Sequence, residues 1–486
     1  MSAMNETTGR AVPRVAPPRM TRRQRLVLSV LLGSTFLLAA DLSLLNVAIP
    51  LVGRDMRFSV GNLQWIATSF ALASAGLALF FGRVGDFVGR RRMFIAGMAL
   101  LVVSSLVGGL ATTATVLIAA RVAQGVATAM SAPAAMTLIT TSFPEGRLRA
   151  RALGANGAMV SAGFIAGAVL SGLLTGLLSW RWAFLVNVPV GGAIMAAAPL
   201  VLRESKVRER SGIDIPGAVT VSAGLAALVY GVSRGADLGW RSPVVFGSVA
   251  VAAVLLVVFW EIELHSKAPL ASVWILRRPT VRWGNTGGLV TIAMQSGLIF
   301  LVTLYLQEVV GYSALATGLA FAVVGVAAFL GGVSAPRAIG RIGYRRSLVC
   351  GLALQMAGPG GLLLLSGRHA GIVAVLAVLA AGAFGHVTAV VSYMVTATSG
   401  LPDEEQGLAT GLTTMTQQVA LALGTPVLSA VATAHLRTVT ANHAAGAAVL
   451  AGVRLALLVD LVVLLVAVLA LAVLLGRRTA QPKQEE

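Results

Sequence analysis

The chain has 486 residues, of which 57% are hydrophobic and only 11% are charged, and its mean hydropathy is +0.86. This composition is far more apolar than a soluble core requires, so it predicts a membrane protein and excludes an ordinary water-soluble globular protein. The formal net charge of +19 could indicate a nucleic-acid-binding protein, but the basic residues are spread along the chain instead of being clustered. We therefore expect no nucleic-acid partner.

The first 25 residues are polar and arginine-rich, and a long apolar run follows them. A cleaved signal peptide is one interpretation of this pattern. The apolar run, however, continues past Ala39 and Ala40 as far as Pro50, which is long enough to cross a bilayer. We therefore expect residues 1–25 to be a basic cytoplasmic tail and the apolar run to be retained as the first span.

Apolar blocks of about 20 residues, the length of a transmembrane helix, recur along the whole chain. They predict an all-α polytopic membrane protein with fourteen spans. The expected spans cover residues 26–48, 61–82, 93–112, 115–140, 150–177, 182–202, 213–234, 242–262, 283–307, 314–334, 345–366, 371–397, 407–432 and 449–475.

The charges between the spans predict the orientation of the chain. With the N-terminus inside the cell, most of the 37 Lys and Arg residues fall in cytoplasmic segments, as the positive-inside rule requires. The acidic loop at Asp403, Glu404 and Glu405 is an exception, because this topology also places it inside. We expect a multi-pass, monomeric protein of the cell (inner) membrane, surrounded by lipids, with both termini cytoplasmic.

A short charged, glycine-rich loop separates the second and third expected spans. Residues 82–92 read Gly-Arg-Val-Gly-Asp-Phe-Val-Gly-Arg-Arg-Arg, which resembles the signature loop between the second and third spans of the major facilitator superfamily. In that family such residues clamp helices together on the cytoplasmic side in one access state. The resemblance therefore implies a gating role for Gly82, Asp86, Gly89, Arg90, Arg91 and Arg92.

A weaker copy of the loop lies 254 positions later, at residues 336–346. The copy keeps cations at Arg345 and Arg346, but Gly340 stands where the first loop has Asp86. This repeat predicts two related six-span halves with two extra spans between them, which resembles the fourteen-span drug:proton antiporter branch of the superfamily. The expected divisions are 1–25 (tail), 26–202 (first six-helix bundle), 203–282 (linker with two extra helices), 283–475 (second six-helix bundle) and 476–486 (cytoplasmic C-terminal tail).

The first span contains a carboxylate, Asp41, within a segment from Asp41 to Pro50 that resembles a pattern of the same branch, with Ser43 where Thr is usual. A charged group within a span is costly, so it should face a cavity or pair with a cation. We expect Asp41 to bind a proton or a cationic part of the substrate. A helix-stabilising contact to a neighbouring span is the structural alternative.

The fourth span contains Arg121 and Gln124, three residues apart on one helix face and followed by Gly125. This spacing resembles a family motif whose Arg belongs to the proton-coupling machinery, and Asp41 is a plausible partner for it here. In the alternative interpretation, Arg121 extends to the outer interface and reaches water.

The fifth span is rich in glycine at spacings that let helices approach closely, including Gly163, Gly167 and Gly172. It resembles the antiporter motif of the family but lacks the usual proline. The following segment, residues 180–191, resembles the start of the sixth span in the drug:proton branch. Near the C-terminus, Asp460 is either a second proton site or a buried helix contact.

The sequence shows no phosphate-binding loop and no metal-ligand spacing, so we expect no cofactor, no metal and no enzymatic activity. The leading hypothesis is proton-coupled export of small lipophilic or amphipathic compounds by alternating access, meaning efflux of drugs, antibiotics or endogenous metabolites. A facilitator or importer of another small solute is the second hypothesis, and a non-transporting membrane receptor or scaffold is the third.

Overall fold

The computed structural model describes residues 20–58, 60–143, 147–204, 214–266, 269, 273–365, 371–401, 403–439 and 445–476. Within these ranges the chain is helical and forms no strand, which confirms the predicted all-α class. Helices are the expected solution in a bilayer, because they satisfy their own backbone hydrogen bonds without water. The expected terminal tails lie mostly outside the described residues.

Thirteen spans, two of them made of two short helices each, are long and apolar enough to cross a membrane, counting only the described residues. Helix α2 is not among them, but it has 29 residues, packs along α4 and α8, and corresponds to the second expected span, 61–82. Most helices extend several residues beyond the predicted spans. Hydropathy marks only the apolar middle of a helix, whereas the backbone ladder continues until a capping residue ends it.

The first bundle contains seven helices, which form six spans. They are α1 (Arg22–Asp55), α2 (Val60–Val88), α3 (Arg90–Gly109), α4 (Ala114–Ser142), α5 (Arg147–Leu177), and α6 (Trp182–Leu185) followed by α7 (Asn187–Val201). Two of their starts have side-chain caps, because Thr21 and Thr113 each accept a hydrogen bond from a backbone N–H in the first turn.

The remaining helices form a central hairpin and the second bundle. The hairpin consists of α8 (Ile215–Leu238) and α9 (Pro243–His265), and a short helix η1 (Val273–Arg277) follows it. The second bundle contains α10 (Pro279–Leu304) with its π-helical end η2 (Tyr305–Val309), α11 (Ala314–Ile342), α12 (Tyr344–Gln355), α13 (Ala357–Leu364), α14 (Ile372–Thr398), α15 (Asp403–Val439) and α16 (Ala445–Gly476).

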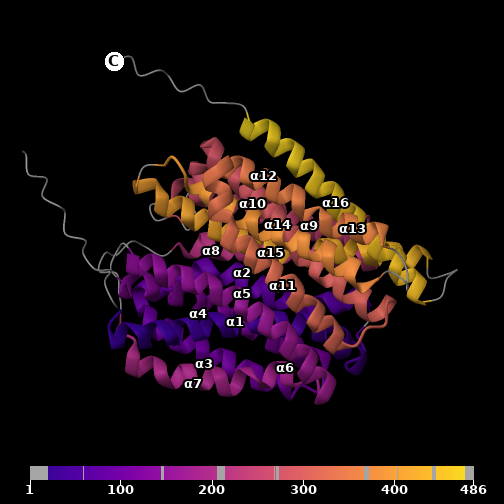
Figure 1. Cartoon of the computed structure of the whole chain (residues 1–486), viewed down its shortest axis with the longest axis horizontal. Helices are drawn as coiled ribbons and strands as arrows, with labels where there is room; N and C mark the ends of the chain where they lie inside the picture. The colour runs from indigo at the N-terminus through magenta and orange to yellow at the C-terminus, as the bar shows by residue number, and fades with distance from the viewer. Residues whose placement is uncertain are drawn as a thin grey trace, which may run out of the picture.

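The two bundles lie against each other, as the separation of the indigo-to-magenta and orange-to-yellow helices shows (Figure 1). They meet along two seams. At the first seam α5 packs on α11, where Gly318 approaches the carbonyl oxygen of Ala168 and Gly172 approaches the backbone of Leu315. Small residues allow this close contact between the two backbones.

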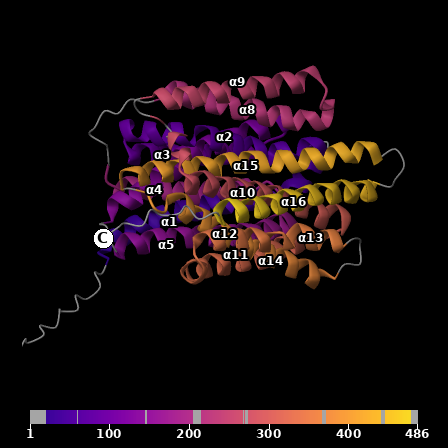
Figure 2. The same ribbon diagram turned by 90° about the horizontal axis from the view of Figure 1, so that it is seen from above.

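The second seam joins α2 to α15, and the hairpin covers it on the outside (Figure 2). The Ser222 hydroxyl of α8 donates a hydrogen bond to the Gly76 carbonyl oxygen of α2. Val221 and Leu225 of α8 form a buried cluster against which Met415 and other partly buried residues of α2 and α15 pack. The hairpin therefore contacts both bundles.

The internal repeat is also present in the backbone. An offset of 254 residues takes the start of α2 at Val60 to the start of α11 at Ala314, and the start of α3 at Arg90 to the start of α12 at Tyr344. The single residues between these helix pairs are Gly89 and Gly343, and both have positive φ, 113° and 80°. Glycine adopts this conformation without the steric cost that other residues meet.

Candidate functional site

Asp41 lies midway along α1 and is buried, with 1% of its surface exposed. Its Oδ2 is 3.3 Å from Nη1 of Arg121 in α4, which is equally buried. Because two charges removed from water stabilise each other only when their remaining polar atoms are also bonded, the surroundings of this pair decide its stability. Arg121 does not extend to the interface, so the alternative interpretation of that residue is wrong.

Neighbouring polar groups complete the pair. Gln124 accepts a hydrogen bond from Arg121 Nη1 at 2.8 Å and donates from Nε2 to Asp41 Oδ1 at 3.3 Å and to Ser105 Oγ at 2.8 Å. Arg121 also donates from Nε to the Ile66 carbonyl oxygen at 2.9 Å. The predicted residues Asp41, Arg121 and Gln124 therefore come together in one polar cluster.

Asn187 belongs to the same cluster, although the predicted site does not include it. It lies at the start of α7, and its Nδ2 donates hydrogen bonds to Asp41 Oδ1 and, at 3.3 Å, to Ser105 Oγ. Its Oδ1 is buried without a hydrogen-bond partner among the described residues. The resemblance of residues 180–191 to a family segment was the only sign of this residue in the sequence.

The cluster lies directly behind the wall of a cavity. The guanidinium carbon of Arg121 is 4.3 Å from the centroid of the Phe70 ring, a cation–π contact. Phe70 itself lines a cavity of about 190 Å³ between the bundles, together with Leu42 and Asn46 of α1. Asp41 and Arg121 are not among the residues that line this cavity. One aromatic ring thus separates the buried charges from the space between the bundles.

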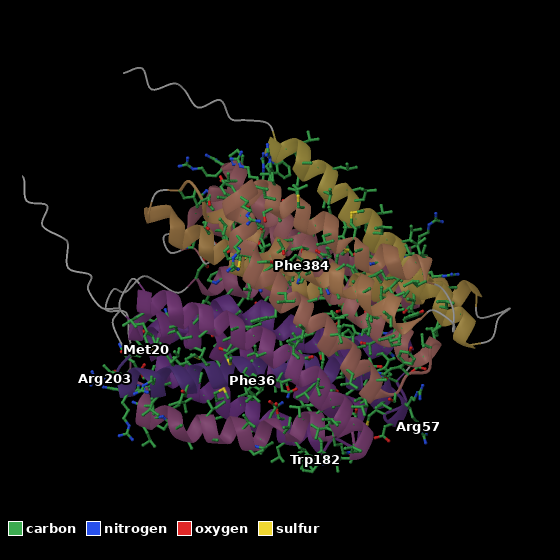
Figure 3. All side chains as sticks on the ribbon, viewed as in Figure 1. Met20, Phe36, Arg57, Trp182, Arg203 and Phe384 are labelled. Carbon is green, nitrogen blue, oxygen red and sulfur yellow. The ribbon has the colours of Figure 1, made fainter. Side chains whose placement is uncertain are left out.

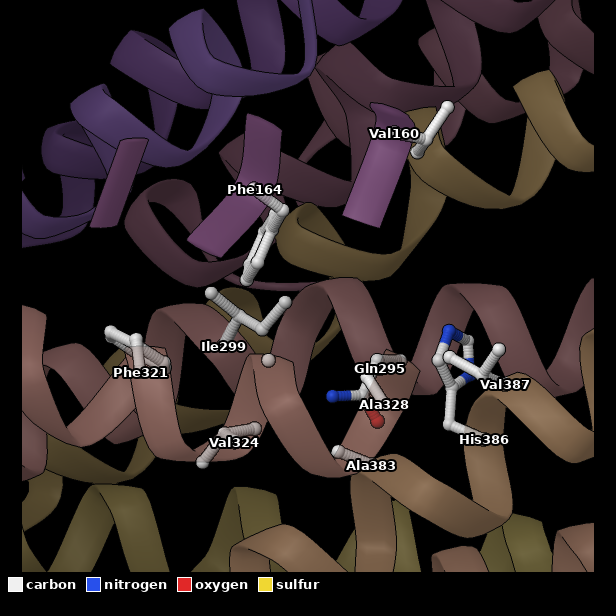
Figure 4. A pocket seen from close by; sticks show the side chains of 11 residues that line it. Val160, Phe164, Gln295, Ile299, Phe321, Val324, Ala328, Ala383, His386 and Val387 are labelled. Atoms are coloured by element: carbon white, nitrogen blue, oxygen red, sulfur yellow. The ribbon is translucent and has the colours of Figure 1, made fainter. Parts of the chain in front are cut away.

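A second cavity of about 200 Å³ lies beside the first (Figure 4). The two cavities share four lining residues, Phe164, Gln295, Ile299 and His386. Their walls come from both bundles, because Phe164 belongs to α5 and the other three belong to α10 and α14. A space formed by both bundles changes when the bundles move, as alternating access requires.

The predicted gating loop is mostly helical, because α2 continues to Val88 and only Gly89 forms the corner between α2 and α3. Gly82 and Asp86 are thus helical residues, and the side chain of Asp86 lies outside the part of the chain that the structure describes. The expectation of an eleven-residue loop was wrong, because a single glycine with positive φ is sufficient for the turn.

The arginines after this corner contact residues at the end of α7 and in α4. The Arg91 backbone N–H donates to Glu204 Oε1 at 3.0 Å, and Arg92 Nε lies 3.9 Å from Glu204 Oε2. Arg90 Nη1 donates to Thr137 Oγ1 at 2.6 Å. Glu204, which the motif did not indicate, is therefore the described acidic partner of this corner. It lies beside Arg203, at the end of the bundle opposite to Arg57 and Trp182 (Figure 3).

The predicted glycines of α5 contact two different helices. A side chain at Gly163 would collide with the Phe36 carbonyl oxygen of α1, and one at Gly167 would collide with the Ala40 carbonyl oxygen, directly before Asp41. Gly172 faces α11 instead. The glycines therefore connect the helix that carries Asp41 to the seam between the bundles.

Asp460 lies in α16 and is fully buried, and neither carboxylate oxygen has a hydrogen-bond partner among the described residues. It does not join the cluster around Asp41, whose contacts come from α4 and α7.

At the end opposite to Gly89, polar contacts join the two bundles directly. Arg54 Nη2, near the end of α1, lies 2.8 Å from Glu308 Oε2 in η2, and Gln307 Nε2 donates to the Val47 carbonyl oxygen at 2.9 Å. Apolar residues of both halves pack in one buried cluster nearby, including Val47, Ile49 and Leu306. The bundles are therefore in contact at this end.

Comparison with known proteins agrees with this architecture. Residues 31–425 match the model of the Major Facilitator Superfamily. The chain is 38% identical to the cephamycin export protein CmcT of Amycolatopsis lactamdurans, over 81% of this chain and 82% of that protein. It is 34% identical to the puromycin resistance protein pur8 of Streptomyces alboniger, over 86% and 83%.

Solved structures support the fold. An inward-facing bacterial homologue of the human lysosomal transporter Spinster matches with a TM-score of 0.66 at 16% identity, over 96% of this chain and 100% of that one. The nucleoside transporter NupG matches with a TM-score of 0.65 at 10% identity, over 92% and 99%. This chain therefore belongs to the Major Facilitator Superfamily and is a membrane transporter, not an enzyme.

Proposed function

We propose that this transporter exports small lipophilic or amphipathic compounds in exchange for protons, with Asp41 as the proton-binding group. The observation that carries the proposal is the buried Asp41–Arg121 pair, which contacts the cavity wall through Phe70. An intramembrane ion pair beside a cavity is more typical of a functional site than of a structural contact. The names of the relatives, which describe antibiotic export and resistance, support an outward direction.

The contacts suggest how protonation and substrate binding are coupled. A proton on Asp41 removes the negative charge that attracts Arg121, while Gln124 and the Ile66 carbonyl oxygen still hold the guanidinium. A change in the position of Arg121 alters its contact with Phe70, and the Phe70 ring forms part of the cavity wall. Proton binding and substrate binding then both depend on the position of the Phe70 ring, so that each weakens the other. Exchange requires this mutual exclusion.

We place the Gly89 corner on the cytoplasmic side of the cell membrane, together with both termini, because most of the basic residues lie at that end. In this orientation the contact between Arg54 and Glu308 closes the external side. Opening to the outside requires this contact to break and the bundles to separate there.

The proposal is tested with inverted membrane vesicles that contain the protein and have either an acidic lumen, so that the proton gradient is directed outward, or no proton gradient. We expect gradient-driven uptake of at least one of puromycin and lincomycin, the amphipathic antibiotics for which two resistance proteins similar to this chain are named. Asp41→Asn should reduce this uptake to the level measured without a gradient. Asp55→Asn is a matched control on the same helix, because Asp55 is half exposed and pairs with Arg181 at the helix end; it should retain uptake.

Two results contradict the proposal. Gradient-independent equilibration of the same compounds indicates a facilitator. Normal gradient-driven uptake by the Asp41→Asn variant shows that the proton binds elsewhere.

A further inference from the structure

We infer that the cavity between the bundles recognises its ligand through Gln295 and His386, and that it selects uncharged amphipathic molecules carrying an N–H or O–H donor. The inference rests on the proposed function, because it names the class of substrate that this transporter takes. Its evidence is separate, since none of it depends on Asp41 or on a proton gradient.

The position of the two residues is the first observation. Gln295 of α10 and His386 of α14 line both cavities, whose other walls are largely apolar (Figure 4). Phe164 of α5 points across the cavity toward Ile299, and Phe321 and Val324 of α11 continue the apolar wall. Such a cavity buries the apolar body of a ligand, and a few polar groups orient it.

A hydrogen-bond relay determines which nitrogen of His386 is available. Gln355 Nε2 donates to the Thr291 carbonyl oxygen at 2.9 Å, so its Oε1 accepts the single hydroxyl proton of Thr291. Thr291 Oγ1 then has only lone pairs to offer to His386 Nδ1, 3.1 Å away, so Nδ1 must carry a hydrogen. In the neutral ring Nε2 is consequently an acceptor. Nε2 has no hydrogen-bond partner among the described residues.

Gln295 is an unused polar group at the same place. Its Oε1 is buried without a partner, and its side chain makes no hydrogen bond with the described residues. A polar side chain left unpaired in a largely apolar cavity is the group that a ligand should satisfy. Rotation of the amide exchanges Oε1 and Nε2, so Gln295 can accept or donate, whereas neutral His386 can only accept at Nε2.

The absence of charge in the described walls limits the ligand further. No Asp, Glu, Lys or Arg is among the residues described as lining the two cavities. A strongly charged ligand would lose its hydration on entering the cavity and would find no opposite charge in these walls, which is unfavourable. A neutral ligand with a donor for His386 Nε2 fits the cavity, whereas a molecule without donors leaves that acceptor unpaired.

The test is a binding measurement on the purified full-length protein in lipid nanodiscs, with no gradient. The probes are chloramphenicol, which is neutral and carries O–H and N–H donors, its N-methyl-1,3-di-O-methyl ether, which has neither O–H nor N–H donors, and tetraphenylphosphonium. We expect chloramphenicol to bind about tenfold more tightly than the ether, the factor that one lost hydrogen bond typically produces. Tetraphenylphosphonium should bind more weakly than chloramphenicol.

The variants identify the residues. Gln295→Leu and His386→Phe should each weaken chloramphenicol binding about tenfold while changing ether binding little. Thr291→Val removes the acceptor of the Nδ1 hydrogen and should reduce the preference for chloramphenicol without changing the lining of the cavity. The matched controls are His265→Phe, at an exposed histidine of α9, and Gln417→Leu, at a half-buried glutamine that lines neither cavity. Elution volume and thermal unfolding verify that each variant folds.

Equal affinity for chloramphenicol and its ether, no binding of chloramphenicol, or tighter binding of tetraphenylphosphonium overturns the inference. An unchanged preference in both Gln295→Leu and His386→Phe also overturns it. Proton-driven transport without donor selectivity contradicts only this inference. Donor selectivity without proton-driven transport contradicts only the proposed function.

Discussion

Asp41 and Gln295 occupy equivalent positions in the two halves of the molecule, because the offset of 254 residues that relates the helix starts also relates these two side chains. Their surroundings differ. Asp41 is buried in a charged cluster behind Phe70, whereas Gln295 faces the cavity beside His386. The first half thus contains a buried ion pair, and the second half has at the equivalent position an amide that lines the cavity.

The difference has a physical reason. A buried ion pair is stable only when both partners and their polar neighbours are present, so it needs a closed environment such as that made by Gln124 and Asn187. A neutral amide tolerates partial exposure to a cavity at a smaller cost. Duplicated bundles can therefore specialise after a single exchange of carboxylate for amide, and the division keeps the proposed proton and substrate sites apart.

The largest expected effect comes from breaking the charged half. Arg121→Met leaves Asp41 buried and unpaired, so we expect a loss of about 3–5 kcal/mol of stability and no gradient-driven transport. The double variant Arg121→Met with Asp41→Asn removes both charges and should regain most of the stability but no transport. Thermal unfolding and vesicle uptake measure the two properties. A single variant as stable as the double variant would contradict the account of the pair.

An intermediate effect should distinguish the two corners. Gly89→Ala and Gly343→Ala both place a side chain at positive φ, which costs about 1 kcal/mol or more. At Gly89 the new Cβ would also lie 2.5 Å from Glu204 Cδ. A Cβ added at Gly343 would meet no described atom within 4 Å apart from its own neighbours in the chain. We therefore expect Gly89→Ala to reduce transport more than Gly343→Ala, because it displaces the partner of Arg91 and Arg92. Equal transport rates at equal expression would refute this assignment.

The smallest effect is expected where the halves touch. Arg54 and Glu308 are 66% and 30% exposed, so their ion pair should contribute only about 0–1 kcal/mol. Glu308→Gln should thus leave the unfolding temperature almost unchanged and slightly favour separation of the bundles at this end. Cysteine cross-linking between two other positions at this end, one on α1 and one on η2, measures the closed population with and without Glu308→Gln, in a protein whose Cys350 is replaced by Ser. A large loss of stability would show that this contact does more than close one end.

The local patterns of the sequence predicted the spans well. Apolar runs and flanking arginines are properties of neighbouring residues, so α1 to α16 appear close to the expected positions, although their ends differ where caps such as Thr21 extend a helix. The residues Asp41, Arg121 and Gln124 could also be selected, because charged and amide groups within apolar runs are rare and costly. Their proposed roles remain predictions.

Other residues of the site could not be found in this way. Asn187 is 146 residues from Asp41, and Glu204 is 113 residues from Arg91. Glu204 lies in a polar segment where charges are ordinary, and Asn187, although it is an amide within the expected span 182–202, has no spacing that links it to Asp41. His386 gains its proposed role only from Thr291 and Gln355, which belong to two other helices. The role of such a residue depends on neighbours that are distant in the sequence and are brought close only by the packing of the helices.

The sequence by itself determined that this is a polytopic membrane protein with a repeated helical half and a carboxylate in its first span, because hydropathy, charge and spacing act along the chain. Only the tertiary structure decided that Asp41 contacts Arg121 and Asn187, that Glu204 accepts a hydrogen bond from Arg91 after the corner at Gly89, and that Gln295 and His386 line the same cavity. The reason is that hydrogen bonds and ion pairs depend on distances of a few ångströms between helices, and those distances follow from how the two bundles pack.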